Sequence, residues 1–137
     1  MIELLVVIAI IGILSSVVLA SLNDARQKSR DAKRIADVKQ LQLALELFFD
    51  SNGSYPTSTG LAGLAPDYIS VLPNDPVTGD DYLYAYYTNG TDYHLATTLE
   101  QSGHTALESD ADFDSDGTNG WTGDAIAGTG SQYDVRP

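Results

Sequence analysis

The chain of 137 residues has no cysteine, no lysine or arginine before Arg26 and no proline before Pro56. Without cysteine, disulfide bonds and thiolate metal sites are excluded. A secretory signal peptide is not expected, because such a peptide begins with a basic region, whereas the first charge here is Glu3. Gly12 is the single glycine among the first 50 residues, so nothing there would break a helix.

Basic residues are few, and six of the seven lie between residues 26 and 39. From residue 40 onward the sequence has 15 acidic residues and one basic residue, Arg136, and the whole chain carries a net charge of −12. Such an acidic surface argues against nucleic-acid binding and favours a self-repelling domain or one that holds divalent cations. The basic cluster fits two interpretations: a solvated helix face with local acidic partners, or a face that contacts lipid headgroups and later acidic neighbours. No grouping of nucleophile and base and no phosphate-binding glycine loop appears, so the sequence predicts no enzyme.

Residues 4–22 form a run without charge in which serines are the only polar side chains. These 19 residues would form about 28 Å of α-helix, close to the hydrocarbon thickness of a bilayer. Glu3 at the end of this run is costly in lipid unless its charge is paired. Two interpretations remain open on these residues alone. The segment is a plain single-pass anchor, or it is a helix that leaves the membrane for a bundle of identical helices, where Glu3 meets a neighbour's terminal amine.

The pattern changes from uniformly apolar to amphipathic after residue 22. Apolar residues then recur at spacings of three and four, which predicts a helix with one buried stripe: Ala32, Ile35, Val38, Leu41, Leu45 and Phe48. Asn52-Gly53 is a typical helix end. We therefore predict one continuous helix over about residues 2–51 that projects from a small domain. Its apolar part covers residues 1–23, and the globular domain covers residues 24–137, with the amphipathic helix half at 24–52.

Turn-forming residues dominate 53–81, for which we predict an ordered loop with a helical turn near residues 61–65. The tyrosine-rich stretch 82–99 predicts a β-hairpin around the turn Asn89-Gly90. Alternation places Leu83, Ala85 and Tyr87 on one face of the first strand. Residues 100–137 form an acidic tail with a last strand predicted at 132–135. The predicted fold class is α+β.

The segment Ile2–Leu14, IELLVVIAIIGIL, resembles the N-terminal helix of type IV pilins and type II secretion pseudopilins. Later features agree in order: an amphipathic helix ending in FFDSNGSYP, a loop containing LPNDP, a tyrosine-rich hairpin and an acidic tail. The resemblance implies the pilin fold, a long N-terminal helix packed on a small antiparallel β-sheet. It also implies a structural subunit that is not an enzyme.

The resemblance further implies cleavage of a leader by a prepilin peptidase, methylation of the new N-terminus, and an inner-membrane pool of subunits. An assembly machinery then moves these subunits into an extracellular surface filament of identical copies. Glu3 occupies the family's glutamate position and would neutralise the terminal amine of an adjacent subunit, and we group Met1 and Gly12 with it as assembly residues. The family has four residues before this glutamate, so we expect that a leader and two mature residues precede Met1, or that the start is unusual.

The function predicted on this basis is a subunit of a type IV pilus-like filament in a bacterium. The alternatives are the major pseudopilin of a type II secretion system and a membrane-tethered extracellular binding module. No nucleic-acid partner is expected.

The acidic tail holds carboxylates at alternate positions followed by a glycine, the donor pattern of a Ca²⁺ loop. The predicted ligands are Asp110, Asp112, Asp114, Asp116 and Asp124. The usual acid at the twelfth loop position is missing, because Gly123 stands there and Asp124 comes one residue later. The alternative is a solvated acidic loop.

The remaining candidates are less specific. His94 and His104 have no ligand spacing, which favours surface or core-edge positions. The tyrosines fit sheet faces and subunit contacts better than a binding cage. Asn52 and Asn89 begin glycosylation sequons, but turns use Asn-Gly in any case.

Overall fold

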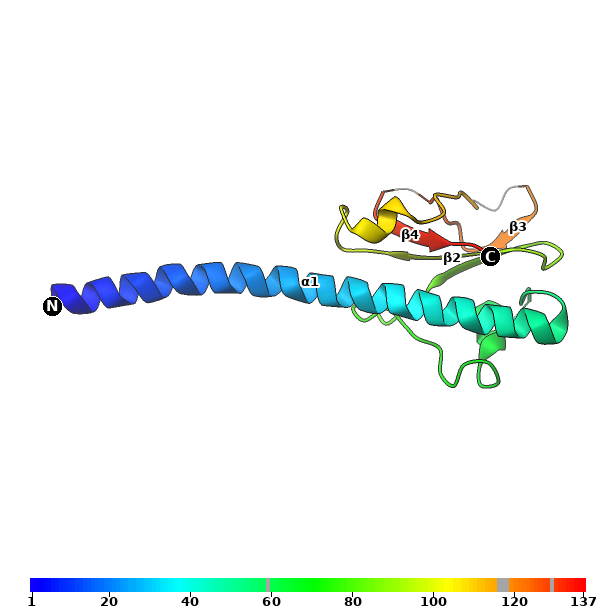
Figure 1. Cartoon of the computed structure of the whole chain (residues 1–137), viewed down its shortest axis with the longest axis horizontal. Helices are drawn as coiled ribbons and strands as arrows, with labels where there is room; N and C mark the ends of the chain where they lie inside the picture. Colours follow the sequence, from blue (N-terminus) through cyan, green and yellow to red (C-terminus); the bar gives the residue numbers. More distant parts are fainter. Residues whose placement is uncertain (59, 116–118, 129) are drawn as a thin grey trace.

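A computed structural model describes residues 1–58, 60–115, 119–128 and 130–137. One helix carries a small sheet near its C-terminal end and projects far beyond it on the N-terminal side (Figure 1). The elements are α1 (Ile2–Asn52), β1 (Leu83–Tyr87), β2 (Tyr93–Thr98), β3 (Trp121–Gly123), β4 (Gln132–Val135) and 3₁₀ turns at Gly60–Leu64 and Thr105–Glu108. This arrangement confirms the predicted α+β fold.

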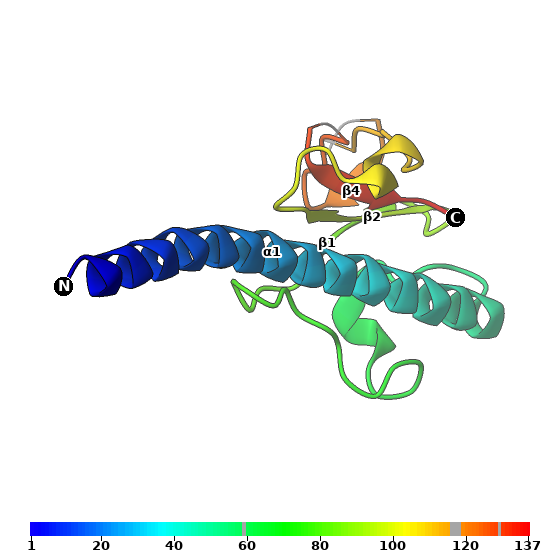
Figure 2. The ribbon, with the colours of Figure 1, turned by 60° about the vertical axis from the view of Figure 1, so that its left-hand side comes forward.

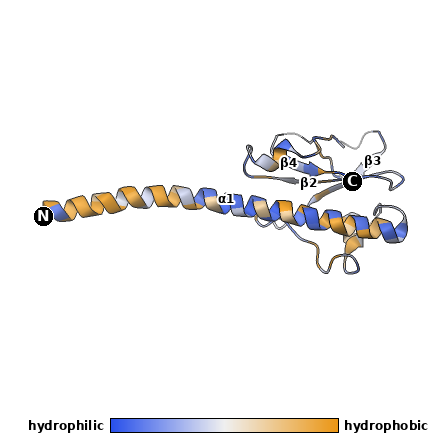
Figure 3. Cartoon of the chain, viewed as in Figure 1, coloured by the Kyte–Doolittle hydropathy of each residue, from blue (hydrophilic) through white to orange (hydrophobic). Residues whose placement is uncertain are grey.

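Helix α1 is continuous over 51 residues, about 75 Å at 1.5 Å per residue, as the absence of helix breakers predicted. It ends at Asn52, and the next residue, Gly53, adopts φ 74° and donates its N–H to the carbonyl of Phe49 at 2.7 Å. A left-handed residue at this position favours glycine. Figure 3 shows the change along the helix from an apolar N-terminal half to a mixed half beside the domain.

The sheet is antiparallel with the strand order β3-β1-β2-β4. Strands β1 and β2 form the predicted hairpin, in which Tyr84 faces Leu95 across the pair. The tail supplies both edges, because β3 pairs with β1 and β4 pairs with β2. The last strand lies at the predicted residues 132–135, whereas β3, only three residues long, was not predicted.

The main core lies between α1 and the sheet. One stripe of the helix meets the tyrosine face of β1 and one face of β2, and the buried members include Val38, Leu41, Leu45, Tyr84 and Leu95. A second cluster covers the other face of the sheet, where Ala85 and Ala96 pack with Trp121 and Ile126. The predicted alternation of β1 is therefore confirmed.

The loop 53–81 passes along the side of α1 away from the sheet, as Figures 1 and 2 both show. Leu61 and Leu64 are buried in the main core and hold the 3₁₀ turn against the helix. This turn lies one residue from the predicted helical turn at 61–65.

Candidate functional sites

The N-terminal part of α1 is the first candidate site. The helix contains an 18-residue window with a mean hydropathy of 2.8, none of it buried, and is long and apolar enough to cross a membrane by length and composition. Glu3 stands in the first helical turn, and Gly12 has open space where a side chain would project. In a single copy this segment has no packing partner among the described residues.

The exposure of this segment decides what it can do. Fully burying one large apolar side chain contributes roughly 1.5–3 kcal/mol, so a row of such side chains strongly favours lipid or other apolar helices over water. The helix begins at Ile2 after the N-cap Met1, and no side chain caps its first turn. A carboxylate at this end interacts favourably with the helix dipole, and a cation from a neighbouring chain would pair with Glu3 directly.

The second feature is a buried ionic cluster where α1 meets the base of the domain. Arg34 is 4% exposed and forms ion pairs with Asp31 at 2.8 Å, Asp75 at 2.5 Å and Glu100 at 2.9 Å. Asp31 is fully buried and also accepts the backbone N–H groups of Glu100 at 2.9 Å and Gln101 at 3.0 Å. The cluster therefore ties the helix to the loop 53–81 and to the chain just after β2.

The charges of this cluster shift one another's pKa values. The hydrogen bond from Arg34 holds the pKa of Asp75 well below its usual range. Hydrogen bonds from Arg30 and Arg34 lower the pKa of Glu100 from 4.5 to about 2. Asp75 and Glu100 are therefore ionised over the whole physiological range. The basic cluster does have local acidic partners, in the pairs Asp31–Arg34 and Lys33–Asp37. The partners Asp75 and Glu100 are distant in sequence and were not predicted.

The third feature is a group of carboxylates at the start of the acidic tail. Asp110, Asp112 and Asp134 each offer an oxygen, and these oxygens lie within 4.8 Å of one another. One buried oxygen of Asp110 has no hydrogen-bond partner among the described residues, and burial together with the charges of Asp134 and Asp112 raises the pKa of Asp110. A bound cation would relieve both effects.

Hydrogen bonds hold the Asp134 carboxylate in place. His94 Nε2 lies 2.7 Å from its carboxylate, and the backbone N–H groups of Asp112 at 3.1 Å and Phe113 at 3.0 Å donate to it. Burial alone would raise the pKa of Asp134, but these hydrogen bonds outweigh burial and lower it. Asp134 therefore stands as an ionised, oriented oxygen donor, which fits a hard divalent cation.

The predicted Ca²⁺ ligands do not all meet at this group. Asp110 and Asp112 belong to it together with Asp134, which lies 22 residues beyond Asp112 and was not predicted. The Asp124 carboxylate instead accepts the backbone N–H of Tyr84 at 2.8 Å, and Asp114 is exposed outside the group. Asp116 lies outside the described residues.

His94 also connects the sheet to the loop before β3. Its Nδ1 lies 2.7 Å from the hydroxyl of Ser115, so Ser115, His94 and Asp134 form a line that resembles a hydrolytic triad. All three residues are buried, at 1%, 0% and 0% exposure, so no substrate reaches the hydroxyl. This line of hydrogen bonds is therefore a structural connection rather than a catalytic site.

The other polar candidates have local roles. His104 accepts the N–H of Ala106 at 3.1 Å and caps the second 3₁₀ turn. The Asn52 amide donates to the carbonyl of Phe48 at 2.9 Å, and Asn89 accepts the hydroxyl of Thr91 at 2.7 Å. Glycosylation at Asn52 or Asn89 stays a prediction.

A long helix, exposed and apolar over its first half and packed on a small antiparallel sheet over its second, defines the pilin class of proteins. Curated relatives narrow this class, and three of them share one name, type II secretion system core protein G. The relative from Escherichia coli K12 is 36% identical over 98 residues, covering 61% of this chain and 67% of the relative. The relative from Vibrio cholerae is 35% identical over 98 residues, covering 61% and 66%.

The relative from Klebsiella pneumoniae is 35% identical over 97 residues, covering 60% of this chain and 69% of the relative. The chain belongs to the family of type II secretion system core protein G, a pilin-like major pseudopilin. It spans about two thirds of the length of these relatives. No family model and no solved structure matches the chain.

Proposed function

We propose that this chain is the repeating structural subunit of a secretion-type filament, a pseudopilus, which is held in the inner membrane before assembly. The observation that carries this proposal is the unburied apolar helix at residues 2–22, continuous with a helix that is locked to a folded domain. The names of the relatives support the secretion filament over the surface type IV pilus that the sequence first suggested. They call the relatives core proteins of a secretion system, which favours a structural subunit.

The proposed mechanism is a transfer of the apolar helix between two apolar surroundings. In the membrane, residues 4–22 face lipid, and in the filament they face the same segment of neighbouring copies. Gly12 would allow helices to approach closely, as small residues do in membrane helix pairs. Glu3 would pair with the terminal amine of a neighbouring copy, because an unpaired carboxylate in an apolar bundle is costly. This pair would set the axial register of the subunits.

Replacing Glu3 by glutamine tests this mechanism, because the variant keeps the shape of the side chain and removes its charge. In cells that express the assembly machinery, we expect Glu3→Gln to insert in the membrane normally but to form few filaments. Asp24→Asn is the matched control, because Asp24 is an exposed acid on the same helix outside the apolar run, and it should assemble like the wild type. A wild-type yield of filaments from Glu3→Gln would refute the role of Glu3.

A membrane-tethered binding module is the second candidate function, in which the helix only anchors the domain. Exchanging residues 4–22 for an unrelated transmembrane helix separates the two candidates. A filament subunit would lose assembly, whereas a tethered module would keep its binding. The requirement for a prepilin peptidase is tested in the same cells by deleting that enzyme.

We also propose that the tail holds one Ca²⁺ ion, with Asp110, Asp112 and Asp134 among its ligands. The support is the convergence of three carboxylates on one place and the unpartnered oxygen of Asp110. Added Ca²⁺ should raise the melting temperature of the full chain in detergent, and a chelator should lower it. Asp112→Asn should lose this response, whereas Asp114→Asn should keep it. A melting temperature that changes neither with added Ca²⁺ nor with a chelator would refute the site.

A further inference from the structure

The basic side chains fall into two groups by their partners. Four form ion pairs within the chain, namely Arg30, Lys33, Arg34 and Arg136. The other three, Arg26, Lys28 and Lys39, are exposed on α1 and have no ion pair with a described residue. In a chain of net charge −12, uncompensated cations on one helix match the acidic surface of another copy.

Two of these cations share one face of the helix with apolar side chains. Lys28, Ala32, Lys39 and Leu43 are spaced by four, seven and four residues, so they line one side of α1, and all four are exposed. We call these four residues the lysine face. Leu43 is 63% exposed, and the helix side that carries Arg34 and Leu41 is buried.

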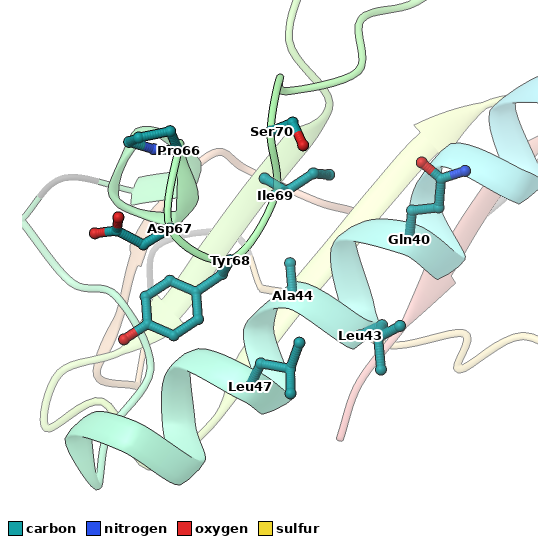
Figure 4. Close-up of a pocket in the computed structure, with 9 residues that line it drawn as sticks. All are labelled: Gln40, Leu43, Ala44, Leu47, Pro66, Asp67, Tyr68, Ile69 and Ser70. Atoms are coloured by element: carbon teal, nitrogen blue, oxygen red, sulfur yellow. The ribbon is translucent and has the colours of Figure 1, made fainter.

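The lysine face borders a groove between α1 and the loop 53–81. Figure 4 shows Gln40, Leu43 and Leu47 on the helix side and residues 66–70 on the loop side. The groove is open and has a volume of about 340 Å³. The Asp67 carboxylate points away from Leu43 and Leu47, so Asp67 brings no negative charge to the helix side of the groove (Figure 4).

A projecting loop on the same molecule has the complementary chemistry. Val77 is 61% exposed, and the exposed acids Asp80 and Asp81 follow it. Neither acid has an ion pair with a described residue. We call residues 75–81 the valine loop.

The valine loop is held rigidly in this exposed position. The Asp75 carboxylate accepts the N–H groups of Val77 at 2.8 Å and Thr78 at 3.1 Å while it pairs with Arg34. The Asp75 carbonyl accepts the N–H of Gly79 at 3.0 Å. A preorganised loop loses little conformational freedom on docking, which favours its use as a contact.

We propose that the valine loop of one copy docks on the lysine face of the next copy in the filament. Val77 would contact Leu43 at the mouth of the groove, and Asp80 and Asp81 would face Lys39. Because Asp75 of the valine loop contacts Arg34, on the buried side of α1, the two surfaces lie on different sides of one molecule. Such a contact is heterologous, and its repetition builds an open filament rather than a closed dimer. This inference rests on the proposed filament function.

Cysteine cross-linking tests the contact, because the natural chain has no cysteine. The double variant Leu43→Cys with Val77→Cys in the full chain, expressed with the assembly machinery, should give a ladder of covalent oligomers after mild oxidation. Either single variant should give no ladder, because a heterologous contact does not bring two equivalent positions together. The control pair Glu108→Cys with Val77→Cys should remain monomeric, because Glu108 is exposed on the tail, away from both surfaces.

Charge exchange is the second test. We expect Lys39→Glu to lower filament yield at least about ten-fold, which corresponds to about 1.4 kcal/mol, and adding Asp80→Lys and Asp81→Lys should restore it. Arg26→Glu, an equal charge change off the lysine face, should leave the yield unchanged.

The outcomes separate this inference from the proposed function. Wild-type filaments with no ladder from the double cysteine variant would overturn the docking and leave the filament function standing. A wild-type chain that forms no filament with the machinery present would overturn both.

Discussion

Replacing Arg34 by alanine should destabilise the domain more than any other single loss of charge on α1. Arg34 contacts three carboxylates at distances of 2.5–2.9 Å and is 4% exposed. Without it, Asp31, fully buried in the native fold, loses its cation and keeps two backbone N–H groups as its partners among the described residues. Asp75 loses its cation at the same time, and Glu100 keeps Arg30 as its remaining cation.

The size of the loss follows from this burial. Removing one partner of a buried ion pair costs about 3–5 kcal/mol, because the remaining charge is left uncompensated. In a domain of about 100 residues this corresponds to a fall in melting temperature of about 15–25 °C. Such a loss approaches the whole stability of a small domain, which is about 5–15 kcal/mol.

The assay is thermal unfolding of the full chain in detergent, followed by near-ultraviolet circular dichroism of the packed tyrosines. Arg30→Ala is the matched control, because Arg30 shares the partner Glu100 but its side chain is 33% exposed, against 4% for Arg34. Ion pairs that are open to solvent contribute less than buried ones, so this control should lose less of its melting temperature than Arg34→Ala. Equal melting temperatures for Arg34→Ala and Arg30→Ala would refute the argument from burial.

Two further predictions concern the dependence of stability on pH and the substitution of glycines at positive φ. Because Arg30 and Arg34 lower the pKa of Glu100 from 4.5 to about 2, its contribution to stability is complete above pH 4.5 and is lost as the pH falls toward 2. Glu100→Gln should therefore lower stability at pH 7 and flatten its dependence on pH in this window; an unchanged slope would contradict the ion pair. Gly123→Ala should cost more than Gly79→Ala, since both have positive φ but only at Gly123 would the new Cβ lie 2.5 Å from a β1 carbonyl oxygen. Equal melting temperatures for these two variants would show that β3 is not held closely against β1.

Local patterns in the sequence predicted the helix and the hairpin because each depends on neighbours in the chain. The spacing of Val38, Leu41 and Leu45 is a property of one helix face, and Asn89-Gly90 is a property of one turn. The end of α1 was predicted within one residue, because the left-handed conformation at Gly53 favours glycine. The resemblance to pilins added the packing of helix on sheet.

The buried polar contacts could not be predicted in this way, because their partners are far apart in the sequence. Arg34 and Asp75 are separated by 41 residues, and His94 and Asp134 by 40. Strand β3 was missed because three residues carry no periodicity. Asp134 was not among the predicted Ca²⁺ ligands because the loop pattern considered only acids close together in the sequence.

The division of α1 into an exposed half and a locked half makes folding and assembly separable by mutation. The window of residues that could span a membrane buries nothing in the monomer, so Glu3→Gln has no contact within the described domain to lose. Lys39 is likewise exposed without an ion pair in that domain. Changes at Glu3 and Lys39 should therefore alter filament yield at an unchanged melting temperature. Changes at Arg34 should lower the melting temperature first and reduce filament yield only through the loss of folded subunits.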